Sequence, residues 1–413
     1  MNVEYLVGSP VIDRVKSSLF TIARNKAISG RVVTDYNHLR TLVKTGKIGE
    51  VLDIGDRIVM DWYSDANTKY DLPWDVVNIG SVVNEHGETV PGLWLQSHWA
   101  LPGIQFDGNE AFWHCDSALA TGTYHITMGN SWGSHVVADK TYQFTLTQAV
   151  PAGGQLVFTT ESSTTGALPD TAVSNWRVRS YSSPTSTTQI EMVTVSEGSS
   201  GTSLGTLSSS TKYSDTGVNN MQRASYGYNR WSQSGIRQWL NSDAAAGAWW
   251  EPKNVFDRPP EQLTTIRGFM AGLPDDFLEI VRPVKVTTAL NTVSDSEIGT
   301  SEDSYERFFL PSLEQEYIVP QLSGVEGSYW PYWKERLELS APQAWYASST
   351  NTNENHYHIR YAIENHTSAQ TVRLRSACRG YAFTAWYVYS TGYVNYYYYA
   401  THAYRSAPAC VIC

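Results

Sequence analysis

Residues 386–396 read Trp386-Tyr-Val-Tyr-Ser-Thr-Gly-Tyr-Val-Asn-Tyr396. Apolar and aromatic residues alternate on both sides of Ser-Thr-Gly, which predicts two short antiparallel strands joined by a turn. Because successive side chains of a strand point to opposite faces, Trp386 and Val388 share one face, and Tyr387 and Tyr389 share the other. We expect the Trp/Val face to cover a core and the tyrosines to point outward.

The tyrosine density of residues 375–413 far exceeds that of the rest of the chain. Tyrosine offers a large contact area, few rotatable bonds and one polar tip, which suits it to recognition surfaces. An exposed cluster of this size usually marks an interaction site. The alternative is that these rings pack against Trp330, Trp333 and Trp345 in an aromatic core.

The composition predicts a multidomain, β-rich protein. The chain has 413 residues, of which 17% are charged and 13% aromatic, and single cores stop growing below this length. A net charge of -10 without a Lys/Arg block gives no attraction for phosphate backbones, so nucleic acid is not an expected partner. Glu4 stands where a signal peptide has Lys or Arg, and no apolar run is long enough to span a membrane. We therefore expect synthesis in a cytoplasm without a signal peptide and no membrane insertion.

The N-terminal part, residues 1–50, is predicted to be a helical attachment or oligomerisation region. A helix over residues 10–28 is indicated by apolar residues at helical spacing, namely Ile12, Val15, Leu19 and Ile22. A second helix is predicted over residues 35–43, with Thr34 as N-cap and Gly46 after its end.

The next part, residues 51–205, is predicted to be a β-sandwich-like domain because strand patterns alternate with turn residues. The expected strands are residues 57–63, 92–98, 123–128 and 141–147. The small, polar stretch from Glu197 to Ser210 indicates a domain boundary. Residues 206–413 are then an α+β domain, with helices near Ser234–Leu240 and Asp275–Ile280.

This C-terminal part resembles the variable proteins of diversity-generating retroelements. The segments that carry the resemblance are Tyr226-Gly-Tyr-Asn-Arg-Trp-Ser-Gln-Ser234, Ile236-Arg-Gln-Trp-Leu-Asn-Ser242, Phe308-Phe-Leu-Pro-Ser-Leu-Glu314, Val372-Arg-Leu-Arg-Ser-Ala377 and Arg405-Ser-Ala-Pro-Ala409. The resemblance implies a C-type-lectin-like fold with a variable region at about 375–413. It also implies a phage receptor-binding protein at a tail-fibre tip, made in a bacterial cytoplasm and carried on the virion. Its partner would be a host-cell surface protein or glycan, and a homo-oligomer, most simply a trimer, would add avidity.

Such retroelements rewrite adenines, typically in Asn codons, so the resemblance also implies which residues vary. Rewritten Asn codons never encode Lys, Glu, Gln, Met or Trp, and residues 375–413 contain none of these except Trp386. The tyrosines from 396 to 399 belong to the reachable set, although which of them vary is open. The expected ligand-binding positions are Cys378, Tyr381, Phe383, Thr384, Tyr387, Tyr389, Tyr393, Asn395, Tyr397, Tyr398, Tyr399, Thr401 and His402. The expected scaffold positions include Trp386, Val388, Gly392 and Arg405.

Two other functions stay open: a fixed structural virion protein, and a glycan-acting enzyme on a lectin-like fold. An enzyme of that kind needs two carboxylates in a cleft, and the candidate pairs are Asp275/Asp276 and Glu314/Glu316. We expect neither catalysis nor a cofactor. We also expect no metal, because Cys410-Val-Ile-Cys413 has no second Cys/His pair at ligand spacing.

Overall fold

The computed structural model describes residues 21–23, 33, 35–162, 168–209, 220–337, 339–346 and 358–413. Its largest sheet has the strand order β1-β2-β3-β4-β23-β16. These strands are β1 (Thr21–Ala23), β2 (Arg57–Tyr63), β3 (Lys69–Val83), β4 (Thr89–Ser97), β16 (Phe308–Phe309) and β23 (Ala409–Ile412). β23 lies between β4 and β16 and is antiparallel to both, so the end of the chain completes a sheet that starts in its N-terminal third.

The burial of these strands follows their sequence patterns. All four residues of β23 are buried, as expected for an uninterrupted apolar strand that is covered on both faces. In β2 the residues alternate, with Ile58, Met60 and Trp62 buried, as expected for a strand with one covered face. The strand prediction for residues 57–63 is confirmed, and the other three predicted strands occur within a few residues as β4, β7 (Gly122–Met128) and β8 (Thr141–Leu146).

Short helices pack against the large sheet, and several of them begin at a residue whose side chain caps the helix. In α2 (Tyr36–Lys44), the Asp35 carboxylate accepts a hydrogen bond from the His38 N–H at 2.7 Å, and Leu39 and Val43 are buried. The helix prediction is therefore confirmed, with Asp35 as the cap; the expected cap, Thr34, lies outside the described residues.

The other two predicted helices are confirmed as α4 (Gly235–Leu240) and α5 (Asp275–Ile280). Ser234 caps α4 by accepting from the Arg237 N–H at 3.3 Å. Asp275 and Asp276 occupy the first turn of α5, where negative charge is favoured by the helix dipole. Two further helices are α3 (Met221–Tyr226) and α6 (Pro331–Leu337).

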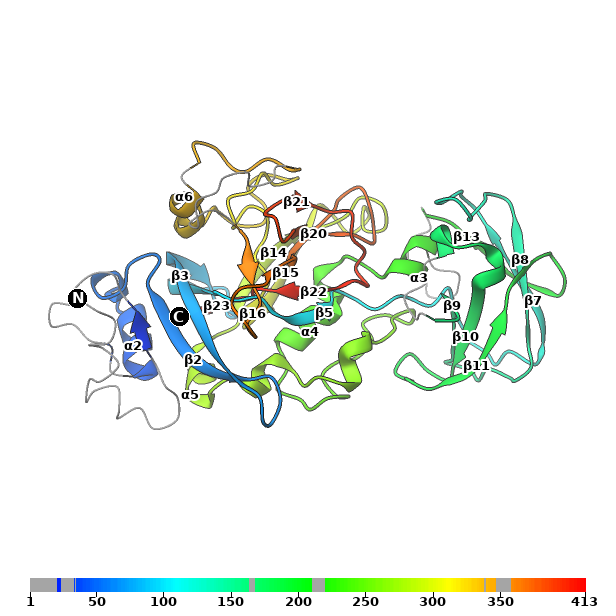
Figure 1. The fold of residues 1–413 in the computed structure, drawn as a ribbon, viewed down its shortest axis with the longest axis horizontal. Helices are drawn as coiled ribbons and strands as arrows, with labels where there is room; N and C mark the ends of the chain where they lie inside the picture. Colours follow the sequence, from blue (N-terminus) through cyan, green and yellow to red (C-terminus); the bar gives the residue numbers. More distant parts are fainter. Residues whose placement is uncertain are drawn as a thin grey trace.

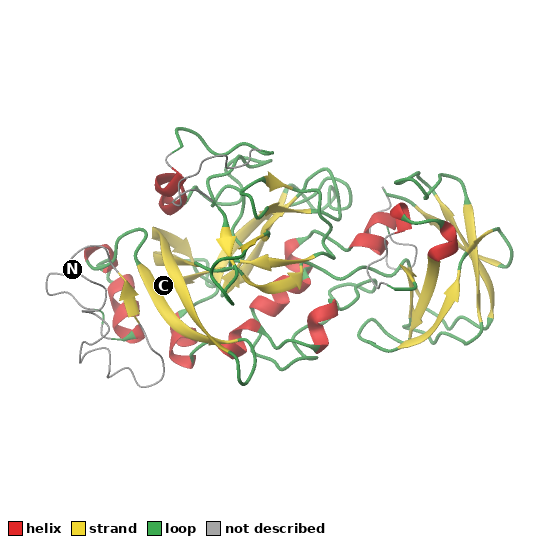
Figure 2. Cartoon of the chain, viewed as in Figure 1, coloured by secondary structure: helices red, strands yellow, loops and turns green. Residues whose placement is uncertain are grey.

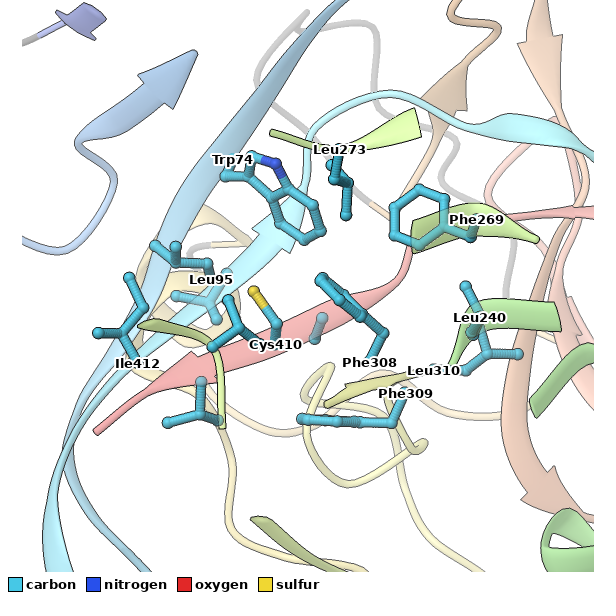
Figure 3. Close-up of a cluster of buried hydrophobic side chains, with 14 of the residues drawn as sticks. Trp74, Leu95, Leu240, Phe269, Leu273, Phe308, Phe309, Leu310, Cys410 and Ile412 are labelled. Atoms are coloured by element: carbon cyan, nitrogen blue, oxygen red, sulfur yellow. The ribbon is translucent and has the colours of Figure 1, made fainter. Parts of the chain in front are cut away.

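A single aromatic core joins the helices to the large sheet. The ring of Phe308 lies 6.0 Å from that of Trp74 and 5.2 Å from that of Phe269. Figure 3 shows these rings with Cys410 and Ile412 of β23 and with Leu240 of α4. Residues from both ends of the described chain thus share one core.

A second body is a β-sandwich of two four-stranded sheets, with the orders β11-β10-β9-β6 and β12-β8-β7-β13. Its remaining strands are β6 (Trp113–His114), β9 (Gln155–Thr160), β10 (Trp176–Tyr181), β11 (Gln189–Thr194), β12 (Ser196–Glu197) and β13 (Thr202–Leu207). Across its separate core, Phe112 stacks on Phe158 at 4.1 Å, and Tyr142 lies 4.7 Å from Trp176. Figures 1 and 2 show this sandwich at one end of an elongated molecule, reached through β5 (Leu101–Gln105) and left through α3.

The structure divides the chain differently from the expected 51–205 and 206–413. β4 pairs with β23, and β5 pairs with residues 403–406, so both strands belong with the C-terminal part and the sandwich begins after β5. The stretch from Glu197 to Ser210, expected to mark the domain boundary, contains the end of β12 and all of β13 within its described residues, with Leu204 and Leu207 buried. Main-chain pairing and the burial of two leucines stabilise these strands, whereas the small polar residues of the stretch have low strand propensity and do not indicate a strand.

Most of the helix expected at residues 10–28 lies outside the described residues. Within it, Thr21–Ala23 is the strand β1, antiparallel to β2, so the helical prediction is wrong for these three residues. Their pairing extends the edge of the large sheet, a long-range contact that a local periodicity does not reveal.

The second sheet of the larger body has the order β21-β20-β19-β22-β5. Its strands besides β5 are β19 (Val372–Ala377), β20 (Ala385–Val388), β21 (Val394–Asn395) and β22 (Ala403–Ser406). Two small hairpins complete the fold: β14 (Val284–Ala289) with β15 (Ser301–Glu306), and β17 (Arg360–Tyr361) with β18 (Ala369–Gln370).

Glu316 is a buried residue whose carboxyl group contacts Gln96 of β4 in the large sheet. It accepts a hydrogen bond from the Gln96 side-chain N–H at 2.7 Å, and burial raises its pKa to about 7, although Arg360 and Gln96 act in the opposite direction. Because the folded-state pKa exceeds the unfolded one, the stabilisation from this group is complete below about pH 4.5 and is lost as the pH rises through about 7.

We predict that Glu316→Gln flattens the dependence of stability on pH. Between pH 5 and pH 8 the wild-type chain should lose roughly 3 kcal/mol of unfolding free energy that the variant does not lose. Urea unfolding at several pH values measures this difference. Glu335→Gln, at an exposed position of the neighbouring helix α6, is the control, and an unchanged slope in Glu316→Gln would contradict the prediction.

Candidate functional site

The candidate site consists of two loops and one turn at the ends of the five-stranded sheet. The first loop, residues 378–384, joins β19 to β20, and the second loop, residues 396–402, joins β21 to β22. The loops lie side by side, because the Ala400 N–H donates to the Phe383 carbonyl at 2.8 Å. Between β20 and β21 the chain turns at Gly392, whose φ of 81° suits glycine.

Asn229 holds the first loop through its main chain. The side-chain amide nitrogen of this fully buried residue donates to the carbonyl oxygens of Tyr381 and Thr384, both at 2.7 Å, and to that of Cys378 at 3.2 Å. Its own N–H donates to the Ala382 carbonyl at 2.9 Å. Every residue type has a main-chain carbonyl, so this anchoring does not depend on the side chains of the loop.

Arg373 of β19 holds the second loop in the same manner. Its guanidinium donates to the carbonyl oxygens of Ala385 and Tyr399 at 2.8 Å, and to that of Tyr398 at 3.2 Å. Burial lowers the pKa of Arg373 to about 10. No carboxylate lies within ion-pair distance of it among the described residues, so main-chain dipoles replace the usual counter-ion.

The expected ligand-binding residues differ in exposure. Tyr381, Tyr389 and Tyr397 are exposed, by 40%, 37% and 60%. Partly buried positions are Tyr393, Tyr398, Tyr399 and His402. The remaining six are buried, which corrects the expectation that they point outward: Cys378, Phe383, Thr384, Tyr387, Asn395 and Thr401.

The buried positions have identifiable structural roles. The side-chain oxygen of Asn395 accepts hydrogen bonds from the main-chain N–H groups of Tyr396 and Tyr397. These bonds stabilise the turn with which the second loop begins. Tyr387 lies under Tyr398, with ring centroids 4.9 Å apart, and its ring centroid is 5.8 Å from the Arg373 guanidinium. These side chains support the loops, and their contacts are with neighbours in the fold.

The predicted alternation of faces along β20 is confirmed. Trp386 and Val388 belong to one buried cluster, in which Trp386 lies 4.8 Å from Trp345. Tyr387 and Tyr389 both contact Tyr398 on the other face. The alternative placed the tyrosine rings against Trp330, Trp333 and Trp345; in the structure Trp345 lies against Trp386, and most of the tyrosines pack against one another.

Tyr346 belongs to this surface although it lies outside the predicted variable region. Its ring is 5.9 Å from that of Tyr393 and 6.0 Å from that of Tyr397, and it is 41% exposed. Its φ of 57° is rare for a tyrosine. Its N–H donates to the Val394 carbonyl at 2.9 Å, which fixes this strained residue against β21.

The sandwich contacts one edge of the loops. Trp132 lies 4.6 Å from Tyr226 and 5.6 Å from Phe383, and Tyr226 stacks on Tyr399 at 3.5 Å. Phe383 and Tyr399 are therefore enclosed between the two bodies. Sequence reasoning missed this contact, together with the anchors Asn229 and Arg373, although both anchors lie in segments that carry the family resemblance.

The expected scaffold residues occupy structural positions. Trp386, Val388 and Gly392 are buried, and Arg405 forms an ion pair with Glu364 at 2.8 Å. Of the acids considered for catalysis, Glu314 and Glu316 are both buried, whereas Asp275 is exposed and Asp276 partly exposed in the first turn of α5. Among the described residues, no group of three His, Cys, Asp or Glu side chains is arranged to hold a metal ion.

We predict that Asn229→Ala destabilises the fold and releases the first loop. The change removes the buried side-chain donor of three hydrogen bonds, which should cost about 3 kcal/mol of unfolding free energy. Amide hydrogen exchange should rise in residues 378–384, and chemical denaturation gives the free energy. Asn37→Ala, at an exposed position of α2, is the control; equal exchange in both variants would contradict the anchoring role.

The part of the chain that the structure describes contains no helix long and apolar enough to cross a membrane. No curated protein and no solved structure matches the sequence. Residues 205–413, half of the chain, match the family described as "Domain of unknown function (DUF6273)". The chain therefore belongs to the DUF6273 family.

Proposed function

We propose that this chain is a noncatalytic, diversified receptor-binding protein of a phage or prophage. In this proposal the two loops, the turn at Gly392 and Tyr346 form a contact surface for a host-cell surface protein or glycan. The observation that carries the proposal is the mode of anchoring: Asn229 and Arg373 bind the loops through main-chain carbonyls. Exposed side chains of these loops can then change while the backbone stays in place.

The chemistry of the surface supports recognition by aromatic contact. Residues 381–404 contain no Lys, Arg, Asp or Glu, so long-range charge attraction contributes little. Tyr381, Tyr389 and Tyr397 each present a ring and a hydroxyl, which combine apolar area with directional hydrogen bonding. Surface substitutions at such positions usually change stability by less than about 0.5 kcal/mol.

The finer parts of the proposal rest on the family resemblance. A C-type-lectin-like fold for the larger body is supported by the antiparallel pairing of β23 with β4 and by the irregular loops above the five-stranded sheet. A homo-oligomer at a tail-fibre tip, with three copies as the simplest case, would multiply weak individual contacts.

Sequencing many copies of the coding locus tests the diversification. We expect adenine-derived substitutions at the exposed positions Tyr381, Tyr389 and Tyr397, next to a near-repeat template and a reverse transcriptase gene. Asn229 and Arg373 should not vary. Loops that never vary, in a locus without a template, would replace this proposal by a fixed structural role.

A triple variant tests the surface itself. Tyr381→Ser, Tyr389→Ser and Tyr397→Ser together should abolish adsorption of the purified chain to susceptible bacterial cells, measured by flow cytometry. The unfolding free energy should change by no more than about 1.5 kcal/mol, because all three side chains are exposed. A matched control replaces Tyr63 and Tyr305, which are exposed by 39% and 45% elsewhere. Equal adsorption of both variants would contradict the proposed surface.

A further inference from the structure

A cavity of about 300 Å³ lies beside the large sheet, outside the two loops and the turn. Its walls come from the residues that follow β4, from α6 and from β17, and the lining residues used below are His98, Trp99, Trp333, Arg336, Arg360 and His366. This volume lies at the lower end of the range for small-molecule sites, which suits a ligand of one ring.

The walls of the cavity are aromatic and held in place. Trp99 stacks on His366 with ring centroids 4.3 Å apart and an interplanar angle of 9°. The Arg360 guanidinium lies 4.8 Å above the Trp333 ring. Trp333 is only 1% exposed and also stacks on His358 at 4.7 Å, so Trp99, which is partly exposed, is the aromatic wall open to a ligand. A flat aromatic face binds the apolar face of a ring better than it binds an inorganic ion.

Positive charge exceeds negative charge around the cavity. Arg336 and Arg360 line it, and Arg57 stands behind His98 with its guanidinium 2.7 Å from the imidazole Nδ1. Two buried carboxyl groups are close to these cations: Asp75, which lies 2.9 Å from Arg57 and 3.7 Å from Arg360, and Glu316, which interacts electrostatically with Arg360.

The protonation states of Asp75 and His98, which lie next to the cavity wall, preserve this excess of positive charge. Asp75 is buried, yet the hydrogen bond from His98 and the charges of Arg57 and Arg360 hold its pKa below the usual range. Burial lowers the pKa of His98 in spite of Asp75. Near neutral pH, the charged Asp75 and the partly charged Glu316 thus stand against the three guanidinium groups of Arg57, Arg336 and Arg360.

Two guanidinium donors lack partners. Arg360 is 4% exposed, and its Nη2 finds no hydrogen-bond acceptor among the described residues; the same holds for Nε of Arg336. A buried unpartnered donor costs about 1–3 kcal/mol. Both nitrogens are buried in the structure, so a carboxylate in the cavity would reach them after a small rotation of the guanidinium groups, whose planar donors match its geometry.

We propose that this cavity binds an acidic monosaccharide unit, with the sugar carboxylate at Arg336 and Arg360 and the ring against Trp99. The inference does not depend on the tyrosine surface, because none of its residues belongs to the loops. It assigns a fixed glycan-binding site to a chain whose other surface is proposed to vary.

Titration of the full-length chain with glucuronic acid and with N-acetylneuraminic acid tests the proposal. Quenching of tryptophan fluorescence and calorimetry should both report saturable binding of at least one acid in the millimolar range or tighter. Neutral glucose should bind at least tenfold more weakly. Arg336→Gln should weaken acid binding at least tenfold, whereas Lys334→Gln, exposed on the same helix, should leave it unchanged.

Arg360 contacts the buried Asp75, so its replacement can unfold the chain; Trp99→Ala therefore serves as the second variant and should also weaken binding at least tenfold. Absence of binding by either acid at 10 mM would overturn the proposal. So would equal affinity for glucose, or binding of inorganic phosphate or sulfate in place of the sugar acids. The tyrosine triple variant should bind the acid normally, which separates this test from that of the receptor-binding surface.

Discussion

The C-terminal surface depends on buried side-chain donors that bind main-chain carbonyls. Asn229 and Arg373 each satisfy several carbonyl oxygens of one loop, and both are almost completely buried. Loss of such a bond is costly in unfolding free energy, because removal of the donor leaves buried acceptors without partners. They are also independent of loop sequence, since the carbonyl groups belong to the backbone. Rigidity of the loops and freedom of their exposed side chains therefore arise from the same contacts.

The anchors are in turn positioned by long-range pairing of the chain. Arg373 lies on β19, whose sheet includes β5 from the N-terminal part, and Asn229 follows the helix that returns the chain from the sandwich. The sandwich itself touches the loops through Trp132 and Tyr226. Changes at the enclosed residues Phe383 and Tyr399 would thus affect the junction of the two bodies, whereas changes at Tyr397 affect only the surface.

Local patterns predicted local structure well. The capped helices, the alternating strand β2 and the two faces of β20 follow from spacing and alternation in the sequence. The division into bodies could not be predicted in this way, because β23 pairs with β4 across most of the chain and β13 is built from a stretch of small polar residues. In the site, the density of tyrosines indicated an aromatic cluster, but it did not indicate which of the tyrosines are exposed. Tyr387 and Tyr389 lie on the same face and both contact Tyr398, yet Tyr387, which also packs against Tyr404, is buried, whereas Tyr389 is 37% exposed.

A crystal structure of a multiply substituted chain tests the central claim most directly. Tyr381, Tyr389, Tyr393 and Tyr397 would be replaced together by Asn, Ser, Thr and His, all of which an adenine-rewritten Asn codon can encode. The account predicts that the backbone of residues 378–402 superposes on that of the original chain, with the hydrogen bonds of Asn229 and Arg373 retained. Rearranged loops in which these bonds are lost would show that the tyrosine side chains, and not the buried anchors, determine the shape of the surface.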